Sequence, residues 1–140
     1  MNISDIIASD VLSGKQVLVA EDNKANQLVL RKLLKKVGIE PVFANNGEEV
    51  LEQYKAEHAR WELVFMDCEM PIMDGYTATE EIRKFEQENS LPRGKIVGLS
   101  AHALDQFREK AIGKGMDDYL TKPIDREVFY NALMDYLVGI

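Results

Sequence analysis

The sequence predicts an α/β protein with a single five-stranded parallel sheet and helices on both faces. Short runs of β-branched and apolar residues alternate five times with longer amphipathic segments, which is typical of successive βα units. Several of these runs are apolar at consecutive positions, as strands covered on both faces require. At 140 residues, the chain is long enough for one such core and too short for two.

The first βα unit follows a poorly patterned start. Residues 1–13 have no clear period, and we interpret them as a linker or an N-terminal helical lead-in, which puts the domain itself at residues 14–140. Residues 16–20 are apolar and β-branched and precede two acids, so they predict a buried strand. Apolar residues recur at helical spacing over residues 24–37, and Gly38 is a typical helix stop.

The second and third units contain the most apolar strand. Residues 41–44 predict a short strand that starts with a proline, which favours a position near a sheet edge. A helix over residues 48–57 follows, with acids early in it. The run over residues 63–66 is wholly apolar and ends on Asp67, and turn residues separate it from a helix over residues 76–88. Asp67 is therefore expected at the carboxyl end of a buried strand.

The last two units are less strongly patterned. Residues 95–99 predict a fourth strand, and the helix expected over residues 104–114 has few apolar residues at helical spacing. Residues 118–120 predict a short fifth strand. Asp125 is a suitable N-cap for a final amphipathic helix, which completes the fifth unit.

Composition excludes several classes of protein. The chain is 46% hydrophobic and 29% charged, as in globular proteins, and its net charge of −7 would repel nucleic-acid backbones. No apolar run approaches the roughly 18–20 residues that span a bilayer, so no membrane contact by this domain is expected. Cys68 is the single cysteine and cannot form an internal disulfide, which fits a reducing cytoplasm.

Polar side chains follow four of the five expected strands. They are Glu21, Asp22, Asp67, Ser100 and Lys122. Because the carboxyl ends of parallel strands meet at one edge of a sheet, these side chains are expected to lie together. Three clustered acids usually hold a hard divalent cation, and oxygen ligands suit Mg²⁺. A carboxylate there can attack phosphorus to give an acyl phosphate, provided that the cation, the ammonium, the hydroxyl and backbone N–H groups neutralise the phosphoryl oxygens.

Each of these residues has a simpler interpretation when taken singly. Asp67 and Ser100 would cap a turn and a helix, the acid pair after the first strand would start a helix, and Lys122 would be a solvated lysine. His58 and His102 are most simply surface or helix-start residues, and we assign neither a catalytic role. The functional interpretation depends on all the polar residues falling at the same end of four different strands.

Four blocks of sequence resemble the receiver domains of two-component signalling. In chain order they are VLVAEDN at residues 17–23, MDCEMPIMDG at 66–75, GLSA at 98–101 and GMDDYLTKP at 115–123. The resemblance extends over nearly the whole chain from Lys15 and implies a flavodoxin-like sheet of strand order 2-1-3-4-5. The residues of these blocks are most similar to those of receivers carried by hybrid sensor histidine kinases. We therefore expect this chain to be a receiver that is either excised from such a kinase or stands alone.

The resemblance implies a phosphoacceptor and a metal site. Asp67 would accept a phosphoryl group from a phosphohistidine, carried by a histidine kinase dimerisation domain or a histidine phosphotransfer domain. Mg²⁺ would be coordinated by Glu21, Asp22, Asp67 and the backbone carbonyl of Glu69. Trp61 opens the strand that ends on Asp67, and we expect its fluorescence to report magnesium binding.

The resemblance also implies a set of contacts to the phosphoryl group and a conformational switch. The Lys122 ammonium, the Ser100 hydroxyl and the backbone N–H of Ala101 would contact the phosphoryl oxygens. Ser100 and Tyr119 would form the switch, with the Tyr119 ring moving from an exposed to a buried position. The peptide bond between Lys122 and Pro123 would be cis, a form that is accessible before proline.

Two other functions share the same local chemistry. A phosphorylation-independent interaction module would keep the fold, but an intact Asp67 and Lys122 argue against it. A Mg²⁺-dependent phosphohydrolase with an aspartyl nucleophile would need a cap or substrate pocket, and five βα units leave no chain to build one. We therefore expect a cytoplasmic signalling domain, either free or within a membrane-anchored sensor kinase, with no enzymatic activity beyond its own phosphoryl transfer and slow autodephosphorylation.

Overall fold

The computed structural model describes residues 2–139 as an α/β fold built on one sheet. The strands are β1 Val17–Ala20, β2 Val42–Ala44, β3 Leu63–Asp67, β4 Ile96–Ser100 and β5 Asp118–Thr121. All neighbouring strands pair in parallel, in the order β2-β1-β3-β4-β5. The predicted fold class and strand order are therefore confirmed.

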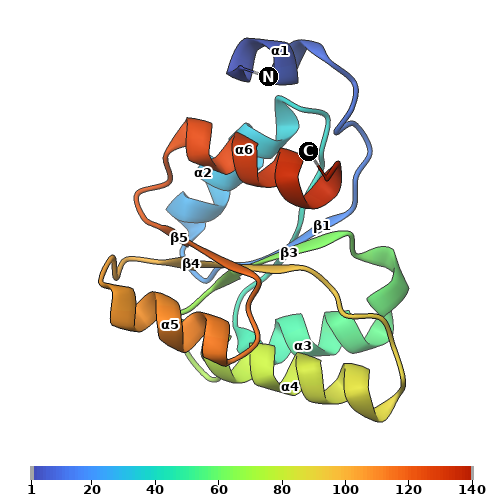
Figure 1. The fold of residues 1–140 in the computed structure, drawn as a ribbon, viewed down its shortest axis with the longest axis vertical. Coiled ribbons are helices and arrows are strands. Elements are labelled where there is room, and N and C mark those ends of the chain that lie inside the picture. Colours follow the sequence, from blue (N-terminus) through green and yellow to red (C-terminus); the bar gives the residue numbers. More distant parts are fainter. Residues whose placement is uncertain (1, 140) are drawn as a thin grey trace.

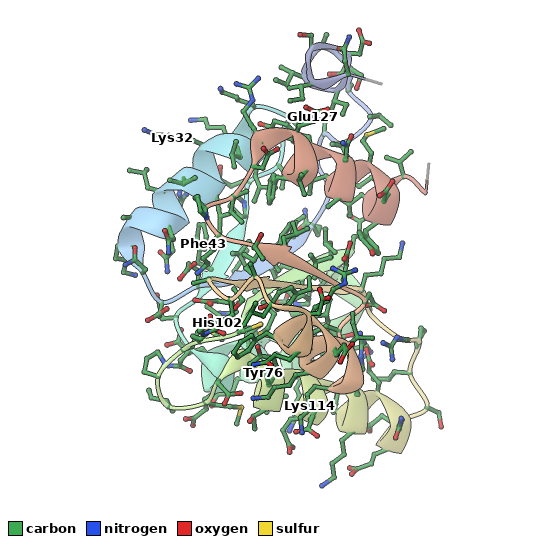
Figure 2. All side chains as sticks on the ribbon, turned by 60° about the vertical axis from the view of Figure 1, so that its left-hand side comes forward. Lys32, Phe43, Tyr76, His102, Lys114 and Glu127 are labelled. Atoms are coloured by element: carbon green, nitrogen blue, oxygen red, sulfur yellow. The ribbon has the colours of Figure 1, made fainter. Side chains whose placement is uncertain are left out.

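Helices cover both faces of this sheet. They are α1 Ile3–Ala8, α2 Lys24–Lys35, α3 Gly47–Ala56, α4 Gly75–Glu88, α5 Asp105–Gly113 and α6 Arg126–Leu137, with a short 3-10 helix η1 at His58–Arg60 that the sequence did not predict. Helices α2 and α6 lie on one side of the sheet, and α3, α4 and α5 lie on the other (Figure 1). Figure 2 shows Lys32 and Glu127 on the first side and Tyr76 and Lys114 on the second. Within residues 2–139, no helix is long and apolar enough to cross a membrane.

The central strands separate two apolar clusters. Alternate residues such as Val19 and Phe65 pack toward α2 and α6, whereas Leu18 and Met66 pack toward the opposite helices. All residues of β1 and β3 are buried, because helices cover both faces of the sheet. The consecutive apolar residues of these strands thus fix the layered arrangement.

Polar caps determine where the helices begin at the carboxyl edge of the sheet. The side chains of Asn23, Asn46, Asp74 and Asp125 each accept a hydrogen bond from the backbone N–H three residues later. At the other end of α2, Gly38 has a φ of +82°, a conformation that glycine adopts readily. The observed helices start and end within about two residues of the predicted positions, as is usual for helix boundaries.

The N-terminal segment packs onto the core. Helix α1 is capped by Asn2, and Ile6 and Leu12 are buried in the cluster that α2 and α6 cover. In Figure 1, α1 lies beyond α6 from the sheet. Residues 3–8 are thus helical rather than extended, while the division of the chain at residue 14 stays a prediction.

The amino edge of the sheet contains a buried ion-pair network. The Arg83 guanidinium lies 3.0 Å from a carboxylate oxygen of Glu86 and 3.0 Å from one of Asp117. It also donates hydrogen bonds to the carbonyls of Gly94 and Gly115. The network joins α4 to the loops that precede β4 and β5, so this edge is held independently of the polar residues at the carboxyl edge.

Candidate functional site

Two buried carboxylates face each other at the carboxyl edge of the two central strands. Glu21 directly follows β1, Asp67 is the last residue of β3, and these strands pair with Ala20 opposite Met66. Glu21 is 0% and Asp67 is 2% exposed, whereas Asp22 is exposed. One carboxylate oxygen from each of the three acids lies within 4.8 Å of the others. The structure thus brings together the acids that the sequence predicted as a cluster.

Lys122 supplies the positive charge of the site. Its Nζ lies 2.8 Å from Oε1 of Glu21 and 3.3 Å from Oδ2 of Asp67, although Lys122 follows β5 at the far edge of the sheet. The Lys122 N–H donates a 2.7 Å hydrogen bond to the Ser100 carbonyl, which ties the loop after β5 to the end of β4. The peptide bond between Lys122 and Pro123 is cis. The ammonium offsets much of the cost of burying two carboxylates side by side.

The pKa values of these three groups depend on one another. Burial, the hydrogen bond with Glu21 and the negative charge of Glu21 together raise the pKa of Asp67 to about 7, although the charge of Lys122 and the hydrogen bond from the Glu69 N–H partly oppose these effects. Burial would also raise the pKa of Glu21, but hydrogen bonds from Lys122, Asn23 and Asp67 lower it overall. Burial would lower the pKa of Lys122, yet the two carboxylates raise it, so the lysine is an ammonium at neutral pH. One ammonium therefore faces two acids that compete for it.

Backbone groups orient the two carboxylates. The Asn23 N–H donates to Oε2 of Glu21 at 3.1 Å, and the Glu69 N–H donates to Oδ1 of Asp67 at 3.2 Å. Gly75 begins α4 so close to Asp67 that a Cβ at this position would collide with the Asp67 carbonyl oxygen. A glycine is therefore required where α4 starts beside the acid.

A glutamine on α2 supports the loop after β1. Gln27 Nε2 donates to the Glu21 carbonyl at 2.6 Å and to Oδ1 of Asn45 at 3.0 Å. It thereby joins the loop after β1 to the loop after β2. Gln27 could not be predicted as part of the site, because a glutamine within an amphipathic helix gives no sequence signal of its own.

Ser100 ends β4, as predicted, but its hydroxyl points to an unexpected partner. Its Oγ donates to the Glu69 carboxylate, at 2.9 Å from Oε1 and 3.0 Å from Oε2, and accepts from the His102 N–H at 3.1 Å. Ser100 does not cap the next helix, since α5 starts at Asp105 after Leu104. The resemblance to receiver domains implied a role only for the backbone carbonyl of Glu69, and the contact of its side chain with Ser100 was not predicted.

Tyr119 differs from the expectation. Its side chain is only 5% exposed, and its hydroxyl donates a 2.6 Å hydrogen bond to the His102 carbonyl. The expected exposed starting position of the ring is therefore wrong for this structure, because the ring packs in the apolar cluster beside α5. The His102 ring is stacked on Phe107, and Ala101 lies exposed between Ser100 and His102.

Two further residues have no direct part in the polar cluster. Cys68 is fully buried next to Asp67, and burial raises the pKa of its thiol to about 12, so it is a neutral core residue. Trp61 precedes β3 and is buried at the amino end of the sheet, six residues before Asp67 and about 20 Å from it along the strand. That its fluorescence reports magnesium binding stays a prediction, and the distance between Trp61 and the acids makes a direct effect of the ion small.

Comparisons with known proteins show the family to which this chain belongs. The response regulator receiver domain family matches residues 17–134, so the chain belongs to this family. The hybrid signal transduction histidine kinase A of Dictyostelium discoideum is 40% identical over 119 residues, which cover 85% of this chain and 6% of that protein. Hybrid histidine kinases are among the matched relatives, as the sequence indicated, and the chain spans between 6% and 13% of the length of those that match first.

Solved receiver structures are also similar. The co-crystal structure of the Saccharomyces cerevisiae histidine phosphotransfer protein Ypd1 with the receiver domain of Ssk1 contains a chain that is 32% identical, with a TM-score of 0.82 and coverage of 89% of both chains. The receiver domain of the sensor histidine kinase PA1611 from Pseudomonas aeruginosa is 35% identical, with a TM-score of 0.77 and coverage of 90% of this chain and 99% of that one. That structure has a magnesium ion coordinated in its active site cleft.

We expect Asp67→Asn to stabilise the chain when divalent cations are removed with EDTA. The wild type keeps two buried carboxylates beside one ammonium, so removing one charge should raise the free energy of unfolding by about 1–2 kcal/mol at about pH 8. The pKa of Asp67 rises from 3.8 to about 7 on folding. Wild-type stability should therefore fall as the pH rises through this range, and the stability of the variant should fall less.

Urea denaturation with and without Mg²⁺ measures both effects. Added Mg²⁺ should stabilise the wild type by mass action and stabilise Asp67→Asn much less. The exposed Asp10 provides a matched control, since Asp10→Asn removes the same charge far from the cluster. A variant that is less stable than the wild type in EDTA, or that gains as much stability from Mg²⁺, would contradict this account of the site.

Proposed function

We propose that this chain is a phosphoacceptor receiver domain of a two-component phosphorelay, which takes a phosphoryl group from a phosphohistidine onto Asp67. One observation carries the proposal. The buried Asp67 carboxylate lies at the carboxyl edge of β3, 3.3 Å from the Lys122 ammonium and within 4.8 Å of two further acids. The proposed nucleophile, the Lys122 ammonium and a set of carboxylate oxygens that could bind a metal thus lie together at the carboxyl edge of the sheet.

The acids fit a magnesium ion. Glu21, Asp22 and Asp67 offer only carboxylate oxygens, and the neighbouring Cys68 is directed into the apolar core. Mg²⁺ takes oxygen ligands at about 2.0–2.1 Å and keeps several waters, so three nearby carboxylates and the carbonyl of Glu69 suit it. When bound, the ion supplies positive charge that neutralises phosphoryl oxygens. The magnesium ion in the PA1611 receiver supports the same assignment here.

Phosphoryl transfer follows from this arrangement. An Asp67 carboxylate oxygen attacks the phosphorus of the phosphohistidine, an O–P bond forms, and the N–P bond breaks with its electron pair remaining on the imidazole. The Lys122 ammonium and the backbone N–H of Ala101 then stabilise the charge on the phosphoryl oxygens. The reaction regenerates the donor histidine and leaves an acyl phosphate on Asp67, which later reacts with water.

The donor we propose is a histidine phosphotransfer domain that docks beside α2. Leu28 and Val29 on α2 are exposed, at 51% and 50%. Val29 borders a groove of about 150 Å³ that Lys122, Pro123 and Ile124 also line. This apolar surface adjoins the acids and would position a phosphohistidine over Asp67. The similarity to the chain crystallised with Ypd1 supports this choice over a kinase dimerisation domain.

The groove also bears on the competing functions and on the location of the domain. A space of about 150 Å³ is smaller than the usual 300–1,000 Å³ of a small-molecule site, so a phosphohydrolase with its own substrate is disfavoured. The free, buried Cys68 is consistent with a reducing compartment. We therefore propose a cytoplasmic signalling domain, either free or within a sensor kinase, rather than an enzyme with a separate substrate.

Acetyl phosphate in the presence of Mg²⁺ should add one phosphoryl group to the chain, and Asp67→Asn should abolish the addition. The amide cannot attack phosphorus as a carboxylate does, whereas Asp10→Asn should be labelled like the wild type. Intact-mass spectrometry and phosphate release measure the result. Labelling that persists in Asp67→Asn would contradict the assignment; continuous rapid phosphate release would favour the phosphohydrolase, and an unlabelled wild type would favour the phosphorylation-independent module.

Val29→Asp should slow phosphotransfer from a histidine phosphotransfer domain by about tenfold or more, because a charge would be buried at the centre of the proposed contact. Labelling by acetyl phosphate should not change, since this small donor needs no docking surface. Ile112 is 43% exposed near the end of α5, on the other side of the sheet, so Ile112→Asp is a matched control. Equal slowing by both variants, or slowing only with a kinase dimerisation domain as donor, would argue against this surface.

A further inference from the structure

The Ser100 hydroxyl has one proton to donate, and the structure commits it to Glu69. A serine hydroxyl is a single donor, so it cannot serve two acceptors at once. The two carboxylate oxygens of Glu69 lie 2.9 and 3.0 Å from Ser100 Oγ, while the His102 N–H occupies the acceptor side of this oxygen. Any new acceptor for Ser100 must therefore replace Glu69.

We propose that the Glu69 side chain is a positioning residue that competes with the phosphoryl group on Asp67 for the Ser100 hydroxyl. The inference rests on the proposed function and adds a role for a side chain whose backbone alone was assigned to the site. While Glu69 holds the hydroxyl, the loop after β4 stays in its present position. The phosphoryl group activates the domain only when it displaces this carboxylate.

The surrounding backbone makes this exchange local. Ser100 pairs with Thr121 across β4 and β5, and its carbonyl accepts from the Lys122 N–H at 2.7 Å. Cys68 N–H also donates to the Leu99 carbonyl at 2.8 Å, which fixes the ends of β3 and β4 relative to each other. Ser100 therefore changes partner by side-chain rotation, with little movement of its backbone.

Charge makes the two partners mutually exclusive. A phosphoryl group adds about 1.5–2 negative charges, and Glu69 is tied closely to Asp67 because its N–H donates to Oδ1 of that residue at 3.2 Å. Two like charges on one hydroxyl repel each other, and Glu69 is exposed, so its side chain can turn into water. Lys122, which bonds to Glu21 and Asp67, remains to neutralise the phosphoryl group.

The exchange also gives a route for the signal. Ser100 Oγ accepts from the His102 N–H, and the His102 carbonyl accepts from the Tyr119 hydroxyl at 2.6 Å. These two hydrogen bonds connect Ser100 to His102 and His102 to Tyr119, so rotation of the Ser100 hydroxyl away from Glu69 alters the hydrogen bonding of both residues. Because the Tyr119 ring is already buried, the first event of the switch is the change of partner at Ser100. A ligand shifts such an equilibrium only through contacts that differ between the two states, and this contact differs.

A double-mutant cycle tests the competition with beryllofluoride, a stable mimic of the phosphoryl group. Its dissociation constant is measured by ¹⁹F NMR at saturating Mg²⁺ for wild type, Glu69→Ala, Ser100→Ala and the double variant. Glu69→Ala should bind about 5- to 20-fold more tightly, as expected for removal of one charge-assisted hydrogen bond and one repulsive charge. In the Ser100→Ala background, Glu69→Ala should increase the beryllofluoride affinity less, because only the removal of the repulsive Glu69 charge then contributes. Glu69→Gln, which keeps an acceptor without the charge, should lie between wild type and Glu69→Ala.

Two controls separate this effect from others. Glu48 is exposed in the first turn of α3 at the same edge, so Glu48→Ala removes a nearby charge without altering Ser100 and should change binding less than about twofold. Without beryllofluoride, Glu69→Ala should bind Mg²⁺ no more tightly than the wild type, because the proposed ligand is a backbone carbonyl and the substitution removes a nearby negative charge that would attract the cation.

Several results would overturn the inference. One is an equal increase in beryllofluoride affinity from Glu69→Ala with and without the Ser100 hydroxyl. Another is weaker beryllofluoride binding by Glu69→Ala than by the wild type. A matching gain in Mg²⁺ affinity would assign the effect to the metal site instead. If the wild type bound no beryllofluoride and accepted no phosphoryl group, the proposed function itself would fail, and this inference with it.

Discussion

The whole site depends on one interaction, the contact of the Lys122 ammonium with two buried carboxylates. Parallel pairing of β1 and β3 forces Glu21 and Asp67 together, and neither can move apart without breaking the central strands. Without a cation, two ionised acids at this depth would be strongly unfavourable. Lys122 stabilises them but does not neutralise both, so the site has an unbalanced negative charge. That imbalance favours a divalent cation, as the proposed function requires.

The rest of the carboxyl edge is arranged around this contact. The Lys122 backbone holds Ser100 at the end of β4, Ser100 holds the Glu69 side chain, and the Glu69 N–H returns to Asp67. These contacts connect Asp67 to Ser100 along two routes, one through Lys122 and one through Glu69. The Arg83 network holds the amino edge independently of this contact.

The positions of the strands and acids along the chain could be predicted because they follow from local patterns, whereas the strand order 2-1-3-4-5 came from the resemblance to receiver domains. Consecutive apolar residues identify buried strands, and parallel strands bring their ends to one edge, so Glu21, Asp67 and Lys122 were placed correctly before any coordinates. The position of Tyr119 and the partner of Ser100 were not predicted. Both depend on side-chain rotamers within loops that meet only after folding, and a single exposed glutamate such as Glu69 carries no pattern of its own. Trp61 lies far from the acids, since a residue that opens a strand lies at the opposite edge from one that ends it.

Amide NMR gives the most direct test of the central claim that phosphoryl chemistry takes place at this edge. Beryllofluoride with Mg²⁺ should shift the amide signals of Glu69, Ala101, His102 and Lys122 most strongly. The amides of Gly94 and Lys95, beside the Arg83 network, should change little. Such a pattern, absent from Asp67→Asn, is the result that the account predicts. Shifts centred on the amino edge, or an equal response from Asp67→Asn, would contradict it.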